Sequence, residues 1–306
     1  MSTMKQTLTD IKTVLLTYQN TTLSDVKTYK RGVLPIAPSF PALAILPEKE
    51  KIIRRRSNGQ QIVEREISIE VYTKAAKKEF AVSQVMDIMD VIKNIGQAQI
   101  TSLWNNTCFD FDMYSETYME PVVLKSTQVV YGGSMRFRFR DHHIIPISSR
   151  KRKASVAETK ASDILDAVYD AIYSYRNDQT YSLSDVNIFV KQDIPPLSKF
   201  PAITVIEGKT NRLKSLTGMD NVSRIFDISV WTELVDKEYS LDKNLDIVEI
   251  LKNILEIEYT FTNSTVARAY NSQIIQTMYN RNDVRSLGRV YRSAIQLEVN
   301  GFEPLV

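Results

Sequence analysis

Hydrophobic and polar residues repeat along the chain with two different periods, which predict helices and strands. Apolar residues recur every three to four positions in Thr7–Tyr18 and Phe80–Ile95, as they do on one face of an α-helix. They recur at every second position in Ile67–Thr73, Cys108–Met113 and Gln128–Arg140, as they do on one face of a strand. We therefore expect an α+β fold in which both kinds of element bury one apolar face.

Capping residues and prolines predict where these elements begin and end. Thr7 and Asp10 have the spacing of a capping box, and Gly96 is expected to cap the end of the second helix. The prolines of the stretch 35–41 exclude helix and central strand, so a loop is expected there. The strands expected on either side of this loop are Val26–Tyr29 and Ala42–Leu46.

The sequence contains an internal repeat. Leu23–Leu46 recurs as Leu183–Ile206 with a constant shift of 160, and eight of the 24 positions are identical. Arg65–Ile95 recurs as Arg224–Ile254 with a shift of 159, and 11 of the 31 positions are identical. Repeats must be recognised before a fold is assigned, because each copy is one structural unit. Three matched pairs are expected to be buried: Phe40 and Phe200, Val71 and Val230, and Ile92 and Leu251.

The two copies predict two domains of the same architecture. In each we expect the order helix–strand–strand–hairpin–strand–helix–strand–strand, an α/β sandwich with the helices on one face of a mainly antiparallel sheet. The domains are placed at residues 1–147 and 161–306. Between them, the stretch 148–160 (SSRKRKASVAETK) is polar, basic and without period, which is typical of a linker. Ser162 is expected to cap the first helix of the second domain.

A long hairpin arm is predicted at Lys49–Glu66. Asn58-Gly59 favours a tight hairpin turn, because both central residues of a type I′ turn need positive φ. We expect an arm that projects from its domain to leave its apolar residues unburied by its own core. Two interpretations remain open: a solvated arm that protects an edge strand from aggregation, or an arm that docks on an acidic neighbour. The residues concerned are Arg54, Arg55, Arg56, Asn58 and Gly59, with the apolar Ile52, Ile53, Ile62 and Val63.

A row of arginines is predicted on the last strand of the first copy. Arg136, Arg138 and Arg140 alternate with apolar residues and so share one strand face. Either this face is solvated, or it contacts an acidic partner protein or passing DNA. The matched residues of the second copy are Gln296, Glu298 and Asn300, so the surface chemistry of the copies differs while the apolar alternation is kept.

Composition and motifs narrow the class of protein. A hydrophobic content of 43% with 25% charged residues is the balance of a soluble globular protein, and a net charge of +3 is too mild to indicate nucleic-acid binding. Neither a transmembrane run nor a secretion signal is evident. Cys108 is the single cysteine, so no internal disulfide is expected and a reducing compartment is the simplest setting.

We expect no enzymatic activity, no metal and no cofactor. The sequence lacks the phosphate-loop, dinucleotide-binding and nucleophile-elbow motifs. His142 and His143 are adjacent and would point opposite ways on an extended chain. Cys108 is expected to be a buried small hydrophobic residue. Asp110 and Asp112 are expected on a solvated face, because no third carboxylate follows at the spacing of a cation site.

The repeated unit resembles the tail terminator proteins of long-tailed phages, also called tail-completion or minor tail proteins. The similarity rests on element order, on the triplets Phe40-Pro41-Ala42 and Phe200-Pro201-Ala202, and on the VYT and VWT strands with their following amphipathic helices. It covers nearly the whole chain, once per half. The resemblance implies a virion structural protein that forms a six-fold ring, caps the tail tube, ends its polymerisation and presents a surface to the head connector.

The resemblance also implies partners and a location. They are further copies of the chain, as a hexamer or as a trimer with pseudo-six-fold symmetry, and the tail tube, sheath and head-connector proteins, with genomic DNA passing through the channel without sequence-specific binding. The protein would be assembled in the host cytoplasm and reside in the virion tail or neck, without a membrane. The alternatives are a head–tail connector or baseplate adaptor, or a cytoplasmic enzyme or nucleic-acid-binding protein. From its lower positive charge we expect the second domain nearer the channel, since phosphate binding would slow DNA transit.

Overall fold

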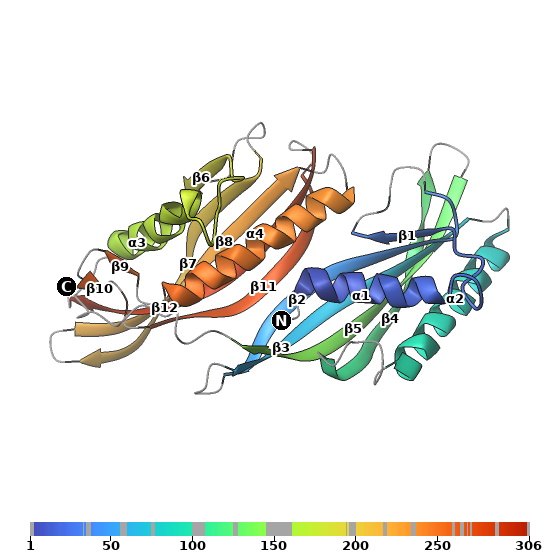
Figure 1. Ribbon diagram of the computed structural model, residues 1–306, viewed down its shortest axis with the longest axis horizontal. Coiled ribbons are helices and arrows are strands. Elements are labelled where there is room, and N and C mark those ends of the chain that lie inside the picture. Colours follow the sequence, from blue (N-terminus) through green and yellow to red (C-terminus); the bar gives the residue numbers. More distant parts are fainter. Residues whose placement is uncertain are drawn as a thin grey trace. The chain divides into compact units, whose positions relative to one another are not determined.

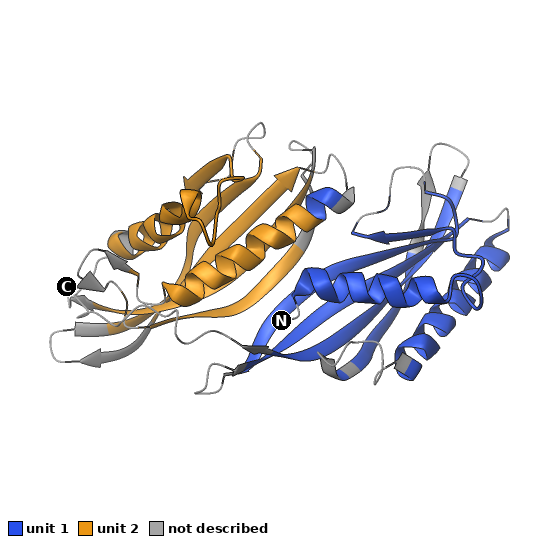
Figure 2. Ribbon diagram, viewed as in Figure 1, with its two compact units in different colours: residues 1–55, 60–143, 236–241 blue, residues 56–59, 144–235, 242–306 orange. Residues whose placement is uncertain are grey.

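The computed structural model describes residues 3–32, 34, 38–55, 60–74, 77–99, 108–124, 128–144, 161–193, 195, 200–216, 219–233, 237–258, 261–263, 266, 267, 269, 271–284 and 288–304. Over these residues the protein is α+β, with mixed but mostly antiparallel strands and four α-helices packed on them (Figure 1). Two compact units divide the chain (Figure 2): residues 1–55, 60–143 and 236–241 form unit 1, and residues 56–59, 144–235 and 242–306 form unit 2. The linker expected at 148–160 lies outside the described residues.

Both units are built from a similar succession of elements. Those of the first are α1 Met4–Thr17, β1 Thr28–Arg31, β2 Ala42–Arg55, β3 Gln60–Thr73, α2 Lys78–Gln99, β4 Cys108–Leu124 and β5 Gln128–Ile144. Those that follow are α3 Ala161–Ser174, the 3-10 turn η2 Tyr175–Asn177, β6 Ile188–Lys191, β7 Ala202–Leu216, β8 Met219–Glu233, α4 Lys237–Ile257, β9 Thr262–Asn263, β10 Val266–Ala267, β11 Asn271–Val284 and β12 Gly288–Pro304.

The strands follow the same order in the two units. Unit 1 has the order β4–β5–β3–β2 with β1 parallel to β2, and unit 2 has β11–β12–β8–β7 with β6 parallel to β7. The pairing register also agrees, because Leu43 lies opposite Val71 in unit 1 and Ile203 lies opposite Val230 in unit 2. These four residues are matched by the sequence repeat. Matched residues of the strands therefore occupy equivalent places in the two units.

α1 begins earlier than the sequence predicted. Thr3 caps it, since its Oγ1 accepts a hydrogen bond from the backbone N–H of Gln6 at 3.1 Å. Thr7, which was expected to form the capping box with Asp10, lies inside the helix, where its hydroxyl donates to the carbonyl of Thr3 at 3.0 Å. That capping prediction is wrong, because the buried face of α1 already begins at Met4, so Thr7 lies on this face and Thr3 is the cap.

One other predicted helix boundary is wrong, and a further one differs by a single residue. α2 runs to Gln99, so Gly96 is not its cap but a buried residue within the last turns. Gly96 lies beside the buried Ile95 and lines the same space as Phe137 and Phe139, so its place in the helix reflects packing rather than helix termination. α3 begins at Ala161, one residue before the expected cap Ser162, a difference within the usual variation of helix ends.

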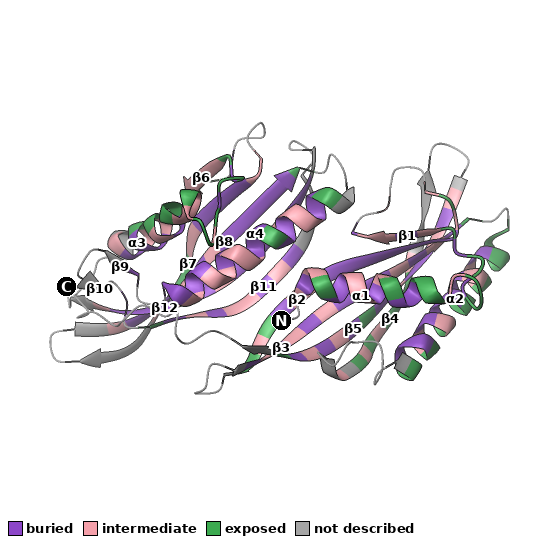
Figure 3. Ribbon diagram, viewed as in Figure 1, coloured by how far each residue is buried: buried purple, intermediate pink, exposed green. Residues whose placement is uncertain are grey.

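Buried residues lie along one side of each helix and along the strands (Figure 3). The matched pairs that are buried as expected are Val71 and Val230, at 0% exposed each, and Ile92 and Leu251, at 2% and 0%. Phe40 and Phe200 are only half-buried, so that prediction is wrong. The reason is that each lies two residues before its strand begins, at Ala42 or Ala202.

β2 and β3 form the hairpin predicted at Lys49–Glu66. β2 runs without a break from Ala42, and the two strands remain paired out to Arg55 opposite Gln61. Ile53 is 46% exposed, as expected of an arm, but Val63 is only 3% exposed. The expectation that the apolar residues of the arm stay unburied is therefore wrong for Val63.

Candidate interaction surface

β5 presents two chemically different faces. Met135, Phe137 and Phe139 are buried, and the two phenylalanines lie against α1 and α2. Arg136 and Arg138, together with Arg140, alternate with them and so lie on the other face of the strand, as the sequence predicted. Arg136 is exposed, whereas Arg138 and Arg140 are half-buried.

Carboxylates from the neighbouring strands pair with two of these arginines. Arg140 Nε lies 3.0 Å from Glu64 Oε2 of β3, and its Nη1 lies 2.6 Å from Asp110 Oδ2 of β4. Arg138 Nε lies 3.5 Å from Glu64 Oε1, and its Nη2 lies 3.7 Å from Glu66 Oε1. Glu64 thus bridges both arginines, and three adjacent strands are joined by alternating charges. We call Glu64, Glu66, Asp110, Arg138 and Arg140 the charge ladder.

Tyr114 of β4 extends the charge ladder. The guanidinium carbon of Arg138 lies 4.7 Å from the centre of its ring, within cation–π range. Its hydroxyl donates a hydrogen bond to Glu66 Oε2 at 3.1 Å. Burial raises the pKa of Tyr114, and the charge of Glu66 and the hydrogen bond to it raise this pKa further, to about 12. The hydroxyl therefore stays protonated and keeps donating at neutral pH.

The charge ladder changes the interpretation of the arginine row as a free basic surface. Partly exposed ion pairs contribute about 0–1 kcal/mol each, so the charge ladder adds little to the stability of the unit. Two of the three arginines meet carboxylates of their own unit, and the face is therefore mixed in charge rather than uniformly basic. Arg136 is the exposed cation of the row, and any contact with an acidic partner would engage it first.

The predicted arm residues are only partly described. Arg54 is exposed on β2, opposite Ile62 of β3. Arg56, Asn58 and Gly59 lie outside the described residues, as does the side chain of Arg55.

A buried ion-pair cluster on the same strands was missed by sequence reasoning. Arg65 of β3 is 2% exposed, and its guanidinium lies 2.9 Å from Glu50 Oε2 of β2 and 2.9 Å from Asp141 Oδ2 of β5. Burial would lower the pKa of Arg65, but the charges of and hydrogen bonds to Glu50 and Asp141 outweigh it and raise the pKa. Arg65 thus holds two carboxylates that would otherwise be buried without a countercharge.

The matched arginine of unit 2 is held in a similar way. Arg224 is 5% exposed, pairs with Glu207 of β7 and donates to Thr210 Oγ1 at 3.1 Å. The signal was available in the sequence, because Arg65 and Arg224 are identical residues that begin the second repeated stretch. A charged residue kept at a matched strand position, among apolar ones, indicates a buried pair.

The corresponding face of unit 2 has different chemistry. Arg292 of β12 lies with its guanidinium carbon 5.0 Å from the Trp231 ring centre and hydrogen-bonds to Ser229 Oγ at 3.1 Å. Glu298, which matches Arg138, accepts a hydrogen bond from Ser223 Oγ at 2.7 Å. The arginine row is replaced here by polar pairs, so the two units present unlike surfaces on the same fold.

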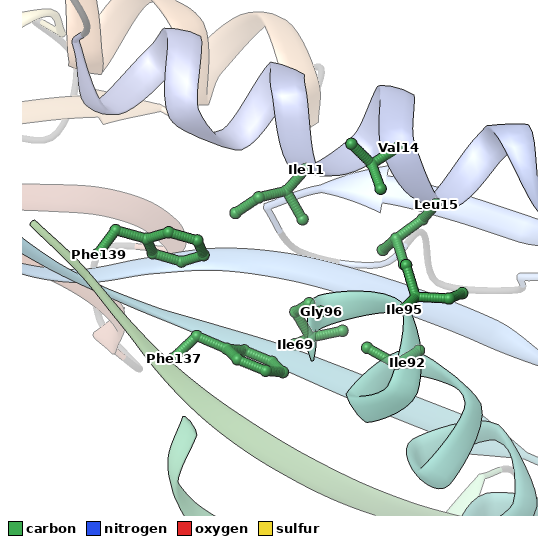
Figure 4. Close-up of a pocket in the computed structure, with 9 residues that line it drawn as sticks. All are labelled: Ile11, Val14, Leu15, Ile69, Ile92, Ile95, Gly96, Phe137 and Phe139. Atoms are coloured by element: carbon green, nitrogen blue, oxygen red, sulfur yellow. The ribbon is translucent and has the colours of Figure 1, made fainter. Parts of the chain in front are cut away.

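An apolar cavity lies between α1, α2 and the strands of unit 1 (Figure 4). Its lining residues are Ile11, Val14, Leu15, Ile69, Ile92, Ile95, Gly96, Phe137 and Phe139. Because both helices and the strands β3 and β5 contribute, α1 and α2 cover the same face of unit 1. The lining contains no polar side chain, so the cavity offers neither hydrogen bonds nor catalytic groups to a ligand.

Matched core positions differ in size in a compensating way. Gly96 of the cavity corresponds to Leu255 in α4, which is 2% exposed. Phe137 and Phe139 correspond to the smaller Leu297 and Val299, both fully buried. A small helix residue faces large strand residues in unit 1, and the reverse holds in unit 2. Cores tolerate such changes when the total volume is kept.

A second difference between matched core positions of the two units concerns their polarity. In unit 1, Gly133 of β5 faces Val85 and Met89 of α2 so closely that a Cβ atom there would lie 2.3 Å from Met89 Sδ. The matched residues of unit 2 are Ser293, Asn244 and Val248, and the Ser293 hydroxyl donates to the Asn244 side-chain oxygen. The Asn244 amide also donates to the carbonyl of Val230 at 3.2 Å. An apolar contact in one unit is thus a buried hydrogen-bonded pair in the other.

Groups that suggest catalysis are sparse. Within the described residues, no three His, Cys, Asp or Glu side chains are placed to hold a metal ion. Asp110 is bound to Arg140, Asp112 and His142 are exposed, and the side chains of Cys108 and His143 are not among those described. Of the helices in the described part of the chain, none is long and apolar enough to cross a membrane.

Comparison with models of known protein families and with curated proteins finds no match for this chain.

Proposed function

We propose that the chain is a structural protein of a virus tail or neck, a tail terminator built from two copies of one α+β unit. A ring of such chains would cap the tail tube, end its polymerisation and join the tail to the head connector. Its partners would be copies of itself and the tail and connector proteins, and its action would be mechanical rather than catalytic.

One observation carries the proposal: the two units share strand order and pairing register. A chain that presents the same unit twice can supply two similar positions in a closed ring, and closed symmetric assembly is the usual form of homo-oligomers. The compensating core exchanges support a duplication, because they keep one packing geometry with two sets of side chains. The different sheet faces suit units that meet different neighbours. The element order is also that of the tail terminators which the sequence resembles.

The direct test is the size and shape of the purified full-length protein. Light scattering should give three or six times the 35.1 kDa mass of the chain, and electron micrographs should show rings with an axial opening. A homogeneous monomer at micromolar concentration would contradict the proposal. Rings without six-fold or pseudo-six-fold symmetry would argue for another role in the particle.

A further inference from the structure

The apolar cavity of unit 1 has room for one small molecule. The volume open to a water-sized sphere is about 20 Å³, whereas one such sphere needs about 10–15 Å³. Side chains from α1, α2, β3 and β5 converge on this space (Figure 4). Its walls belong to the core of the unit, since Ile11, Ile92 and Phe137 are buried.

Water is a poor occupant of this cavity. An enclosed water molecule needs two to four hydrogen-bonding partners, and the lining residues offer it no polar side chain. An apolar molecule of similar size loses no hydrogen bonds on entering and gains dispersion contacts with the surrounding side chains. Cavities lined by isoleucine, leucine and phenylalanine accordingly stay dry and take up apolar molecules.

Gly96 keeps this space open although the residue is unfavourable there. Glycine lowers the stability of a helix interior, and unfilled space lowers the stability of a core. The matched position of unit 2 holds the buried Leu255, so the shared fold accepts a larger residue. Phe137 and Phe139 take up part of the corresponding space in unit 1, yet a cavity remains beside Gly96. A position at which two unfavourable effects persist together is expected at functional sites.

We propose that this cavity is a binding site for a single small apolar molecule of about the size of a xenon atom, held by dispersion contacts without hydrogen bonds. The inference concerns unit 1 by itself and is independent of the proposed ring.

Xenon is the probe for this site, because it is monatomic, apolar and unable to form hydrogen bonds. The full-length protein is labelled with ¹³C in its isoleucine methyl groups, and their NMR shifts are recorded at increasing xenon pressure. Saturable shifts are expected for Ile11, Ile69 and Ile92, which line the cavity. Ile228 and Ile254 of unit 2, which match Ile69 and Ile95, are equally buried internal references and should not shift.

Variants of α2 show whether filling the cavity blocks the site. Gly96→Ala should weaken xenon binding about 10-fold or more, and Gly96→Leu should abolish it, because the added side chains occupy the space. Met86→Ala is the matched control, since Met86 is 45% exposed on the same helix and does not line the cavity. This control should bind xenon like the wild type. Alanine is favourable in a helix, so the test does not depend on whether the leucine variant folds.

Three results would overturn the inference. The lining methyl groups could show no saturable shift, or they could shift equally in Gly96→Leu and the wild type. Shifts of the same size at Ile228 and Ile254 would also overturn it, because xenon would then dissolve in both cores without a defined site. None of these results bears on whether the protein forms rings, which light scattering decides separately.

Discussion

Replacing Gly96 by alanine adds one methyl group to the apolar cavity of unit 1, at a position inside α2. Glycine in a helix interior is about 1 kcal/mol less favourable than alanine. Burying one more methyl group contributes about 0.8 kcal/mol if the cavity accepts it. We therefore expect the variant to be more stable by about 2 kcal/mol, a shift in melting temperature of roughly 4–8 °C for a unit of this size.

Differential scanning calorimetry of the full-length chain measures this effect. If the units unfold in separate transitions, the transition of unit 1 should move and the other should serve as an internal reference. Gly133→Ala is the matched control, because its new Cβ would lie 2.3 Å from Met89 Sδ and 2.9 Å from Val85 Cγ1. Overpacking of this kind lowers stability by about 1–3 kcal/mol.

A second step uses the repeat itself. Gly96→Leu introduces the residue found at the matched position, Leu255, and should lower stability by overpacking the core beside Phe137 and Phe139. The double variant Gly96→Leu, Phe139→Val also introduces the residue matched by Val299 and should recover most of the lost stability. A Gly96→Ala variant less stable than the wild type would show that the cavity cannot accept a methyl group. Additive effects of Gly96→Leu and Phe139→Val would show that the two positions do not share one space.

Other consequences of the described contacts can be measured on the same protein. Arg65→Met should lower the free energy of unfolding, measured in urea, by about 3–5 kcal/mol, because Glu50 and Asp141 are then buried without a countercharge. Adding Glu50→Gln and Asp141→Asn to this variant should restore part of the lost free energy. Glu64→Gln should lower stability by less than about 1 kcal/mol, and the difference should vanish in molar salt; an equal effect in high salt would argue against an electrostatic role for the charge ladder. The pKa of Tyr114 is raised from 10.0 to about 12, so its contribution to stability should be complete below pH 10 and lost as the pH rises through 12. The stability difference between the wild type and Tyr114→Phe should shrink over that range, and a pH-independent difference would contradict the assigned shift.

Local periodicity was sufficient to predict parts of β3, β4 and β5 and the apolar faces of α1, α2 and α3. β3 and β5 alternate between buried and less buried residues over most of their length, because one face meets the helices and the other carries the charge ladder. The repeat then extended the assignments of β6, β7, β8, α4 and β12 to the second unit, whereas the residues of β9, β10 and β11 were not predicted. Gly96 was misjudged because glycine ends helices in general, and only the packing of α2 against Phe137 and Phe139 explains a glycine inside one.

The ion pairs depend on contacts that no local window contains. Arg65 binds Glu50, 15 residues earlier, and Asp141, 76 residues later. Arg140 likewise binds Glu64, 76 residues before it. Sequence reasoning identified the arginine row but not its partners, since the order of β4, β5 and β3 in unit 1 decides which charges meet.

The exchange between Gly133 and Ser293 limits how pieces of the two units can be recombined. In a chimera that carries α4 in place of α2, Asn244 would face Gly133 of β5, with no hydroxyl opposite its side-chain oxygen. In the reverse chimera, Met89 would crowd the hydroxyl of Ser293, and that hydroxyl would face Val85 instead of an amide. A helix can therefore be exchanged between the units only together with the strand on which it packs. The smallest exchangeable part is the helix–strand pair, not the helix or the strand alone.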